Sequence, residues 1–164
     1  MGRVETKIVV PSGQNLIVWH QKESIDDAQG TFLNEKKVFQ YWLDTGRFRE
    51  VPSPIPLEDF VTVPADPWSI YALEHGKTPM RFIRVDFRGQ NGSSVVNLKS
   101  YDKPRGDPAL ANLRNEFIFM IGGGLGEKNR YTTFYDKATK SCQMYNIATN
   151  TWHKAPDLNG PKYR

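Results

Sequence analysis

An apolar run that ends in three glycines limits the folds open to this chain more strongly than any other feature. The run is Phe117 to Ile121, and Gly122 to Gly124 follow it directly. This pattern is typical of a buried strand that stops where the backbone must pass close to another segment. Further along, Tyr145 leads through a tight turn at 149–150 to Trp152, which indicates a strand, a turn and a returning strand. The segment therefore predicts antiparallel β-structure.

Together the two parts of this segment resemble the kelch motif, which forms one four-stranded blade of a β-propeller. In that family an apolar strand ends in a glycine pair, and a strand with a Tyr leads through a Thr-Asn turn to a Trp that packs between blades. The matching positions here are Gly122, Gly123, Tyr145, Thr149, Asn150 and Trp152. The resemblance implies that these are structural positions of a blade.

A second copy of the pattern lies earlier in the chain. Tyr41 to Pro52 aligns without a gap on Tyr145 to Pro156, and the offset of 145 − 41 = 104 residues equals two periods of 52. Kelch repeats are about 50 residues long, so one further blade is expected between the two copies. In this alignment Tyr41 corresponds to Tyr145, and Phe48 stands where the later copy has Trp152.

The repeats predict an all-β fold: a partial kelch-type β-propeller of about three four-stranded antiparallel blades. We expect blade 1 at 1–52, blade 2 at 53–104, blade 3 at 105–156 and the start of a further blade at 157–164. Blade 2 departs most from the motif, because its turn at Gly89 to Gly92 lacks both the Thr-Asn pair and a following aromatic residue. Propellers close with roughly four to eight blades, so we also expect a fragment of a longer propeller.

Three polar or irregular segments are the expected connections. Gln21 to Glu35 is polar and is predicted to be a long surface loop, as is Gly124 to Lys140 with a short strand at Tyr131 to Tyr135. Asp107 to Arg114 is compatible with either a short helical turn or an inner strand. The resemblance to kelch propellers implies that partner contacts are made by the loops 21–35 and 124–140 and by His75 to Thr78.

Composition excludes several classes of function. The net charge of +4 comes from scattered Lys and Arg rather than dense basic runs, so no nucleic-acid partner is expected. No apolar run approaches the length of a membrane span, and no membrane insertion is expected. The single cysteine, Cys142, rules out an internal disulfide and is expected to be a small packing residue in a reducing compartment.

No catalytic, cofactor-binding or metal-binding group is predicted. His20 and His75 are expected at matching ends of second strands, where a metal or acid/base site could form, but partly exposed polar residues at strand ends are the favoured interpretation. The glycines after Ile121 lack the Gly-Lys-Ser/Thr ending of a phosphate loop. We instead assign His75, Lys128 and Arg130 as candidate partner-binding residues.

Two classes of function remain open. The first is a non-catalytic protein–protein interaction scaffold, a subunit or segment of a larger assembly, expected in the cytoplasm, for example on cytoskeletal or ciliary structures. The second is a propeller-fold enzyme, galactose-oxidase-like or sugar-epimerase-like, whose site is not evident in this segment. The fold alone does not choose between them; the scaffold is the favoured hypothesis.

Overall fold

The computed structural model describes residues 3–12, 15–26, 31–52, 55, 59–88, 93–125 and 137–161. All regular elements in these ranges are β-strands. Nothing in them forms a helix of the length and hydrophobicity that a membrane span requires.

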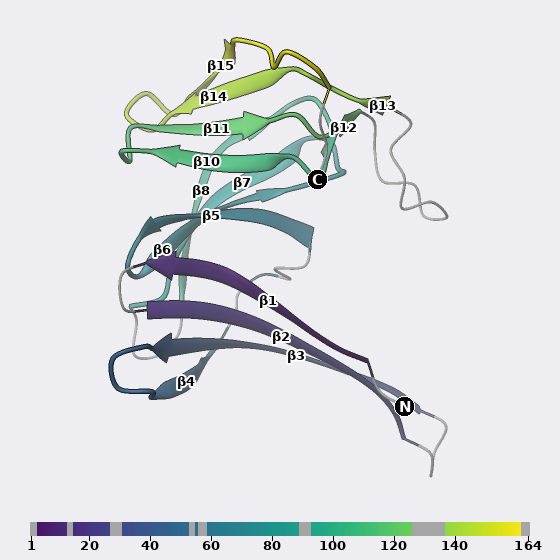
Figure 1. Ribbon diagram of the computed structural model, residues 1–164, viewed down its shortest axis with the longest axis vertical. Coiled ribbons are helices and arrows are strands. Elements are labelled where there is room, and N and C mark those ends of the chain that lie inside the picture. The colour runs from purple at the N-terminus through teal and green to yellow at the C-terminus, as the bar shows by residue number, and fades with distance from the viewer. Residues whose placement is uncertain are drawn as a thin grey trace.

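Twelve of the strands form three antiparallel sheets of four strands each, and in each sheet the strands lie in chain order (Figure 1). Blade 1 consists of β1 (Arg3–Ser12), β2 (Asn15–Asp26), β3 (Thr31–Trp42) and β4 (Phe48–Val51). Blade 2 consists of β5 (Phe60–Asp66), β6 (Ser69–Glu74), β7 (Met80–Asp86) and β8 (Ser94–Tyr101). Blade 3 consists of β10 (Ala109–Leu113), β11 (Phe117–Ile121), β14 (Cys142–Asn146) and β15 (Thr151–Ala155).

The first strands of the three sheets lie beside one another, β1 next to β5 and β5 next to β10. The sheets therefore fan out from their first strands, and Figure 1 shows blade 1, blade 2 and blade 3 in succession along the fan. This arrangement is a partial β-propeller with three four-stranded antiparallel blades, and the predicted fold class is confirmed.

Blade 2 is buried on both of its faces because it lies between the other two sheets. Successive side chains of a strand point to opposite faces, and along β6 this alternation serves two cores. Ile70 belongs to a cluster with Val51 of blade 1, whereas Tyr71 belongs to a cluster with Ile118 of blade 3. The side chain of Ile70 is fully buried, and shortening such a residue to Ala typically costs about 2–5 kcal/mol.

The predicted loop at Gln21 to Glu35 is wrong. β2 continues to Asp26 and β3 begins at Thr31, and the two strands stay paired from Gln21 opposite Lys36 to Asp26 opposite Thr31. A strand is held by backbone hydrogen bonds, which polar residues form as readily as apolar ones. The polarity of this segment was therefore not evidence for a loop. The turn predicted for blade 2 at 89–92 lies outside the described residues.

The remaining connections also differ in part from expectation. The segment 107–114, left open between a helical turn and a strand, contains the inner strand β10. The predicted loop 124–140 has short strands at both ends, β12 (Gly124–Leu125) and β13 (Lys137–Ala138), while the expected strand at 131–135 lies outside the described residues. β12 pairs with both β13 and β9 (Arg105–Gly106), and these three strands form a small fourth sheet.

Candidate functional site

The connections of blades 2 and 3 meet at the strand ends on one side of the sheets, where Figure 1 shows β12 and β13. We call this region the loop end and define it as residues 75–79, 102–108, 122–125 and 137–141. Backbone hydrogen bonds join its segments directly. The amide of Gly76 donates to the carbonyl oxygen of Arg105 at 2.7 Å, and the amide of Thr139 donates to that of Gly123 at 2.9 Å. The loop end is therefore one hydrogen-bonded unit.

The glycine pair singled out by the sequence forms the turn into this unit. Gly122 and Gly123 both have positive φ, +62° and +95°, which glycine adopts without steric cost. A Cβ atom on Gly123 would lie 2.7 Å from the carbonyl oxygen of Gly106 and 3.2 Å from Pro108. The glycines therefore let the chain leave β11 and pass closely against the segment that enters blade 3.

Arg105 fixes the same turn from inside the molecule. Its side chain is only 4% exposed, and Nη1 donates hydrogen bonds to the carbonyl oxygens of Gly122 at 2.9 Å and Ser141 at 3.2 Å. Hydrogen bonds from a charged donor are stronger than those from a neutral one. Arg105 thus joins both ends of the long β11–β14 connection to the segment before β10.

His75 and Asp107 meet beside this buried arginine. His75 follows β6 immediately and its amide donates to the carbonyl oxygen of Asp59 at 3.0 Å. The imidazole is 10% exposed, and its Nδ1 lies 3.2 Å from Oδ1 of Asp107, an ion-pair distance when the ring is protonated. The two residues come from different blades, so the fold rather than the local sequence brings them together.

Lys77 adds a second group of charges to the loop end. Its ammonium group forms an ion pair with Glu74 and lies 4.0 Å from Oδ2 of Asp59. The hydrogen bond to Glu74 raises the pKa of Lys77. The loop end therefore presents charges of both signs on a backbone frame held by hydrogen bonds.

The chemistry of the loop end is that of paired charges. No group of three or more His, Cys, Asp or Glu residues able to hold a metal ion occurs in the ranges that the structure describes. Cys142 is buried, with Sγ 3.7 Å from the carbonyl oxygen of Lys140. His153, which is exposed on β15, contacts the hydroxyl of Thr151 through Nε2 at 2.8 Å.

Tyr145 and Trp152 face each other across β14 and β15 and fill the space between blades 2 and 3. They are a cross-strand pair, and both rings contact Phe82 of blade 2, with centroid distances of 4.8 and 5.3 Å. Tyr145 is fully buried and its hydroxyl donates to Oδ1 of Asn150 at 2.6 Å. That oxygen also accepts a hydrogen bond from the amide of Lys99 at 2.8 Å, so the turn of blade 3 is bonded to blade 2.

In blade 1, Tyr41 and Phe48 hold the register position that Tyr145 and Trp152 hold in blade 3. They are a cross-strand pair of β3 and β4, and their rings stack with a centroid distance of 6.0 Å. The neighbouring Val38 packs toward blade 2, so the alternation of the strand directs Tyr41 to the opposite face. Phe48 is 64% exposed. This pair therefore faces away from the described blades, unlike Tyr145 and Trp152.

The other candidate residues have mixed outcomes. Lys128 and Arg130 lie outside the described residues. The expectation that His20 and His75 occupy matching strand ends is wrong, because β2 continues past His20, which pairs with Lys37. Sequence reasoning missed Arg105 and Asp107: no periodic pattern surrounds them, and the only local signals are nearby prolines and glycine.

An open hollow adjoins the outer side of Trp152. It has a volume of about 450 Å³ and lies between the end of β8 and β15. Its lining residues are Lys99, Ser100, Tyr101, Asp102, Lys103, Gln143, Thr151, Trp152 and Lys154. Lys99, Lys103 and Lys154 give this hollow a basic rim, and Asp102 and Lys103 connect it to the loop end.

The blades and their aromatic junctions define the chain as part of a β-propeller. No protein-family model and no curated protein matches the sequence. Among solved structures, the alignment with YjhT covers 93% of this chain and 52% of the YjhT chain, with a TM-score of 0.60 and 12% sequence identity. The alignment with a fungal alcohol oxidase of the AA5 family, in complex with copper, covers 91% of this chain and 42% of the oxidase chain, with a TM-score of 0.56 and 11% sequence identity. The chain spans about half the length of these structures, and the likeness shows the propeller-type fold.

Proposed function

We propose that this chain is a non-catalytic interaction module that binds another protein through its loop end, within a multi-subunit assembly. The proposed setting is the cytoplasm, in a cytoskeletal or ciliary structure. Connections between propeller strands are suited to binding because they vary in sequence while the blades hold them in place.

The observation that carries this proposal is the combination of a fixed frame and exposed charge. Arg105 and the glycine turn hold the backbone, while Lys77 and Asp107 are exposed on it. A surface that is already ordered loses little conformational entropy on binding, which favours affinity. Its charges of both signs suit a protein partner with complementary charges, because such pairing gives specificity.

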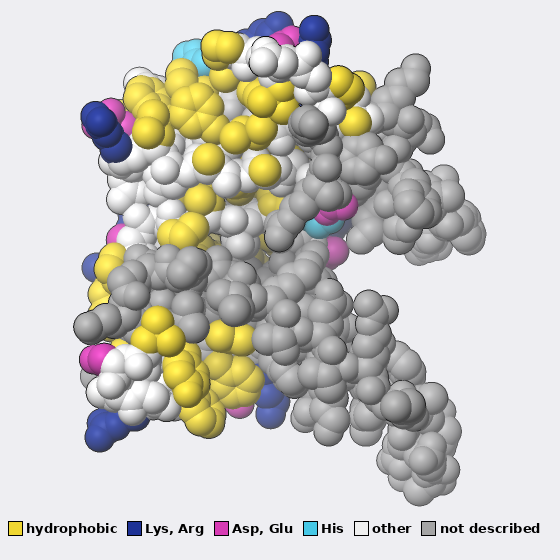
Figure 2. Space-filling model, viewed as in Figure 1, with side chains coloured by type: hydrophobic (Ala, Val, Ile, Leu, Met, Phe, Trp, Pro, Cys, Tyr) yellow, Lys and Arg dark blue, Asp and Glu magenta, His cyan; other side chains and the backbone are white. Residues whose placement is uncertain are grey.

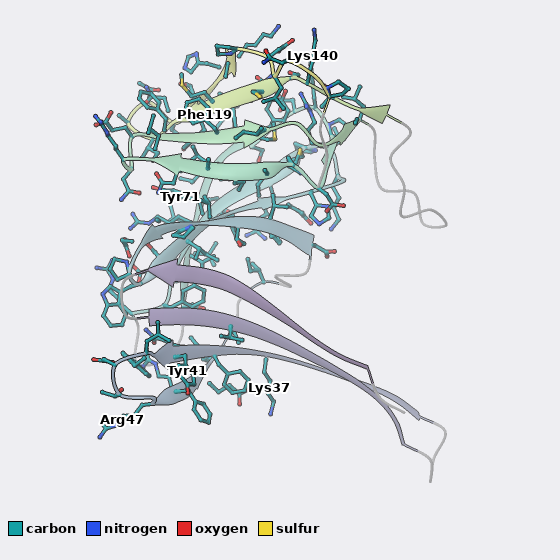
Figure 3. The ribbon with its side chains drawn as sticks, viewed as in Figure 1. Lys37, Tyr41, Arg47, Tyr71, Phe119 and Lys140 are labelled. Atoms are coloured by element: carbon teal, nitrogen blue, oxygen red, sulfur yellow. The ribbon has the colours of Figure 1, made fainter. Side chains whose placement is uncertain are left out.

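A charge reversal at the loop end tests this proposal. Tagged wild-type chain would be used for affinity capture followed by quantitative mass spectrometry, in parallel with Lys77→Glu and Arg47→Glu. Both residues are exposed, but Arg47 lies in the turn between β3 and β4 of blade 1, far from the loop end (Figure 3). We expect a stoichiometric partner that is lost with Lys77→Glu and retained with Arg47→Glu. A partner that is retained by both variants would contradict binding through the loop end.

A propeller-fold enzyme, galactose-oxidase-like or sugar-epimerase-like, is the alternative. The observation that favours it is the contact between His75 and Asp107, because a carboxylate beside an imidazole can orient it as a general base. Two assays test this alternative. Peroxide release measures the oxidation of primary alcohols in the presence of copper, and chromatography measures the epimerisation of sugars. Turnover that is lost in His75→Gln and kept in His153→Gln would replace the interaction module with an enzyme.

A further inference from the structure

The hollow beside Trp152 continues the junction between blades 2 and 3 outward. One wall is formed by the end of β8 and the residues after it, and the other by β15 together with Gln143 of β14. Trp152 and Lys154 lie on the same face of β15, because residues two apart on a strand point the same way. That face is turned toward blade 2, since Trp152 packs on Phe82. The walls of the hollow therefore belong to two adjacent blades, and the outer faces of the fan take no part in it.

Lysine side chains surround this hollow. Lys99 and Lys103 come from the blade 2 side and Lys154 from the blade 3 side, and all three are exposed. Asp102 is the acidic residue among the described lining residues, so positive charge is in excess. Lys154 lies 3.9 Å from Oδ1 of Asp157. No carboxylate in the described part of the chain lies within ion-pair distance of Lys99 or Lys103.

The basic character extends along this margin of blade 3. Figure 2 shows Lys or Arg side chains at the margin of the molecule next to β15, and Figure 3 labels Lys140 there. Arg47, which is labelled in the same figure, lies at the opposite end of the fan. A surface lined mainly by one sign of charge attracts ligands of the opposite sign. The charge around the hollow therefore indicates an anionic ligand.

The backbone beside the hollow is already bonded, which restricts how a ligand binds there. β8 is an edge strand with β7 as its neighbour in the sheet, and edge strands commonly accept a further strand. At Lys99, however, the amide donates to Oδ1 of Asn150 and the carbonyl oxygen accepts from Nε1 of Trp152. A ligand cannot pair with these backbone groups, so side chains must recognise it.

The donors around the hollow indicate which kind of anion suits it. Compact phosphate sites use arginine forks, helix N-termini or consecutive backbone amides. The described lining contains neither an arginine nor a helix, and its lysines are spread over two blades. Separated ammonium groups suit several carboxylates that are spaced along one chain. The half-buried ring of Trp152 adds apolar surface for the methylene groups of such a chain.

We propose that this hollow binds an extended acidic segment of another protein, whose carboxylates pair with Lys99, Lys103 and Lys154. Its volume of about 450 Å³ lies within the usual range of ligand sites. Exposed ion pairs are weak individually, so several carboxylates must bind together, and salt weakens the complex. The site does not involve Lys77, and either this proposal or the one for the loop end can fail without the other.

Fluorescence anisotropy with a labelled hexaglutamate peptide tests this site. We expect a Kd that rises with salt, and no binding of a labelled hexaglutamine peptide. The double variant Lys103→Glu with Lys154→Glu should raise the Kd more than about tenfold, because two attractive charges become repulsive. Arg47→Glu is the control at the far end of the fan and should change the Kd less than about twofold. Equal weakening by the double variant and the control would show attraction to net charge alone and overturn the proposal.

Nuclear magnetic resonance locates the peptide without any substitution. Hexaglutamate should shift the indole NH signal of Trp152 and leave that of Trp42, at the end of β3, unchanged. Inorganic phosphate is the second probe and, at equal ionic strength, should displace the peptide no better than chloride does. An unshifted Trp152 signal, or displacement by phosphate in preference to chloride, would overturn binding of an acidic segment. Near-wild-type circular dichroism of each variant establishes that the sheets remain folded.

Discussion

The indole Nε1 of Trp152 donates a hydrogen bond to the carbonyl oxygen of Lys99 at 2.7 Å, and this bond joins the outer strand of blade 3 to the outer strand of blade 2. The ring of Trp152 also lies 5.3 Å from the rings of Phe82 and Tyr101, centroid to centroid. One side chain thus supplies both apolar contact and a directional bond across the junction. The pair of contacts explains why a Trp suits this position better than another aromatic residue.

Two substitutions of Trp152 should separate these contributions. Trp152→Phe keeps an aromatic ring but removes the donor to Lys99, and should lower the free energy of unfolding by about 1 kcal/mol. Trp152→Ala also removes the ring contacts and should cost about 3 kcal/mol, the lower end of the usual range because the side chain is half-buried. Urea denaturation measures both. Equal costs for the two variants would contradict the role of the ring contacts.

Tyr145 should make stability depend on pH in the alkaline range. Burial, with a contribution from the nearby Tyr71, raises the pKa of Tyr145 to about 12, above its ordinary value of 10.0. The folded state therefore holds the phenol proton at pH values where the unfolded state has released it. The stability that this gives is fully present below about pH 10 and is lost as the pH rises toward 12.

The comparison variant for this pH effect is Tyr145→Phe. At neutral pH it should cost about 1 kcal/mol, because the hydrogen bond to Asn150 is lost. Between pH 10 and 12 its free energy of unfolding should fall less steeply than that of the wild type, and the difference isolates Tyr145 from the titrating lysines. Parallel curves for the two proteins would show that Tyr145 ionises normally in the folded state.

Gly123 should tolerate no side chain. Gly123→Ala combines a positive φ with a Cβ placed 2.7 Å from the carbonyl oxygen of Gly106, and should cost about 3 kcal/mol or more. Gly46→Ala is the matched control, because Gly46 has a φ of +65° but nothing within 4 Å of an added Cβ. Its cost should be about 1 kcal/mol. Thermal unfolding of both variants measures the difference, and similar losses would contradict the close approach at Gly123.

Arg105 should be required for order at the loop end. Arg105→Met keeps the length of the side chain but removes the donors to Gly122 and Ser141, and should lower the free energy of unfolding by about 2–4 kcal/mol. Arg81→Met is the control: Arg81 bonds to Asn97 on the surface and should contribute less than about 1 kcal/mol. Hydrogen exchange of the Gly76 and Thr139 amides follows the loop end directly. Unchanged protection in Arg105→Met would contradict the bracing role.

Much of the blade architecture could be predicted because it follows from local patterns. The glycines after Ile121 and the cross-strand partners Tyr145 and Trp152 are encoded in short segments, and their spacing recurs in Tyr41 and Phe48. Blade 2 resembled the motif least for a physical reason. Val85 and Val95 fill its equivalent position with aliphatic side chains, which pack the junction with blade 1 without the aromatic signature.

The loop end could not be predicted, because its contacts join segments that are distant in sequence. Nothing near His75 indicates Asp107, and nothing near Arg105 indicates that its donors reach Ser141. The long hairpin of β2 and β3 escaped prediction for a different reason, because its backbone pairing extends into a segment without apolar alternation. Local patterns predict strands with a buried face. The loop end depends instead on contacts between distant segments, and the extended hairpin depends on backbone pairing.

The most direct test of the three-bladed arrangement is a nuclear Overhauser measurement from the indole NH and ring protons of Trp152. If the blades pack as described, these protons should show contacts to the rings of Phe82 and Tyr101 in blade 2 as well as to Tyr145. Contacts to Tyr145 alone, with none to blade 2, would contradict the packing of blade 3 on blade 2 and with it the propeller.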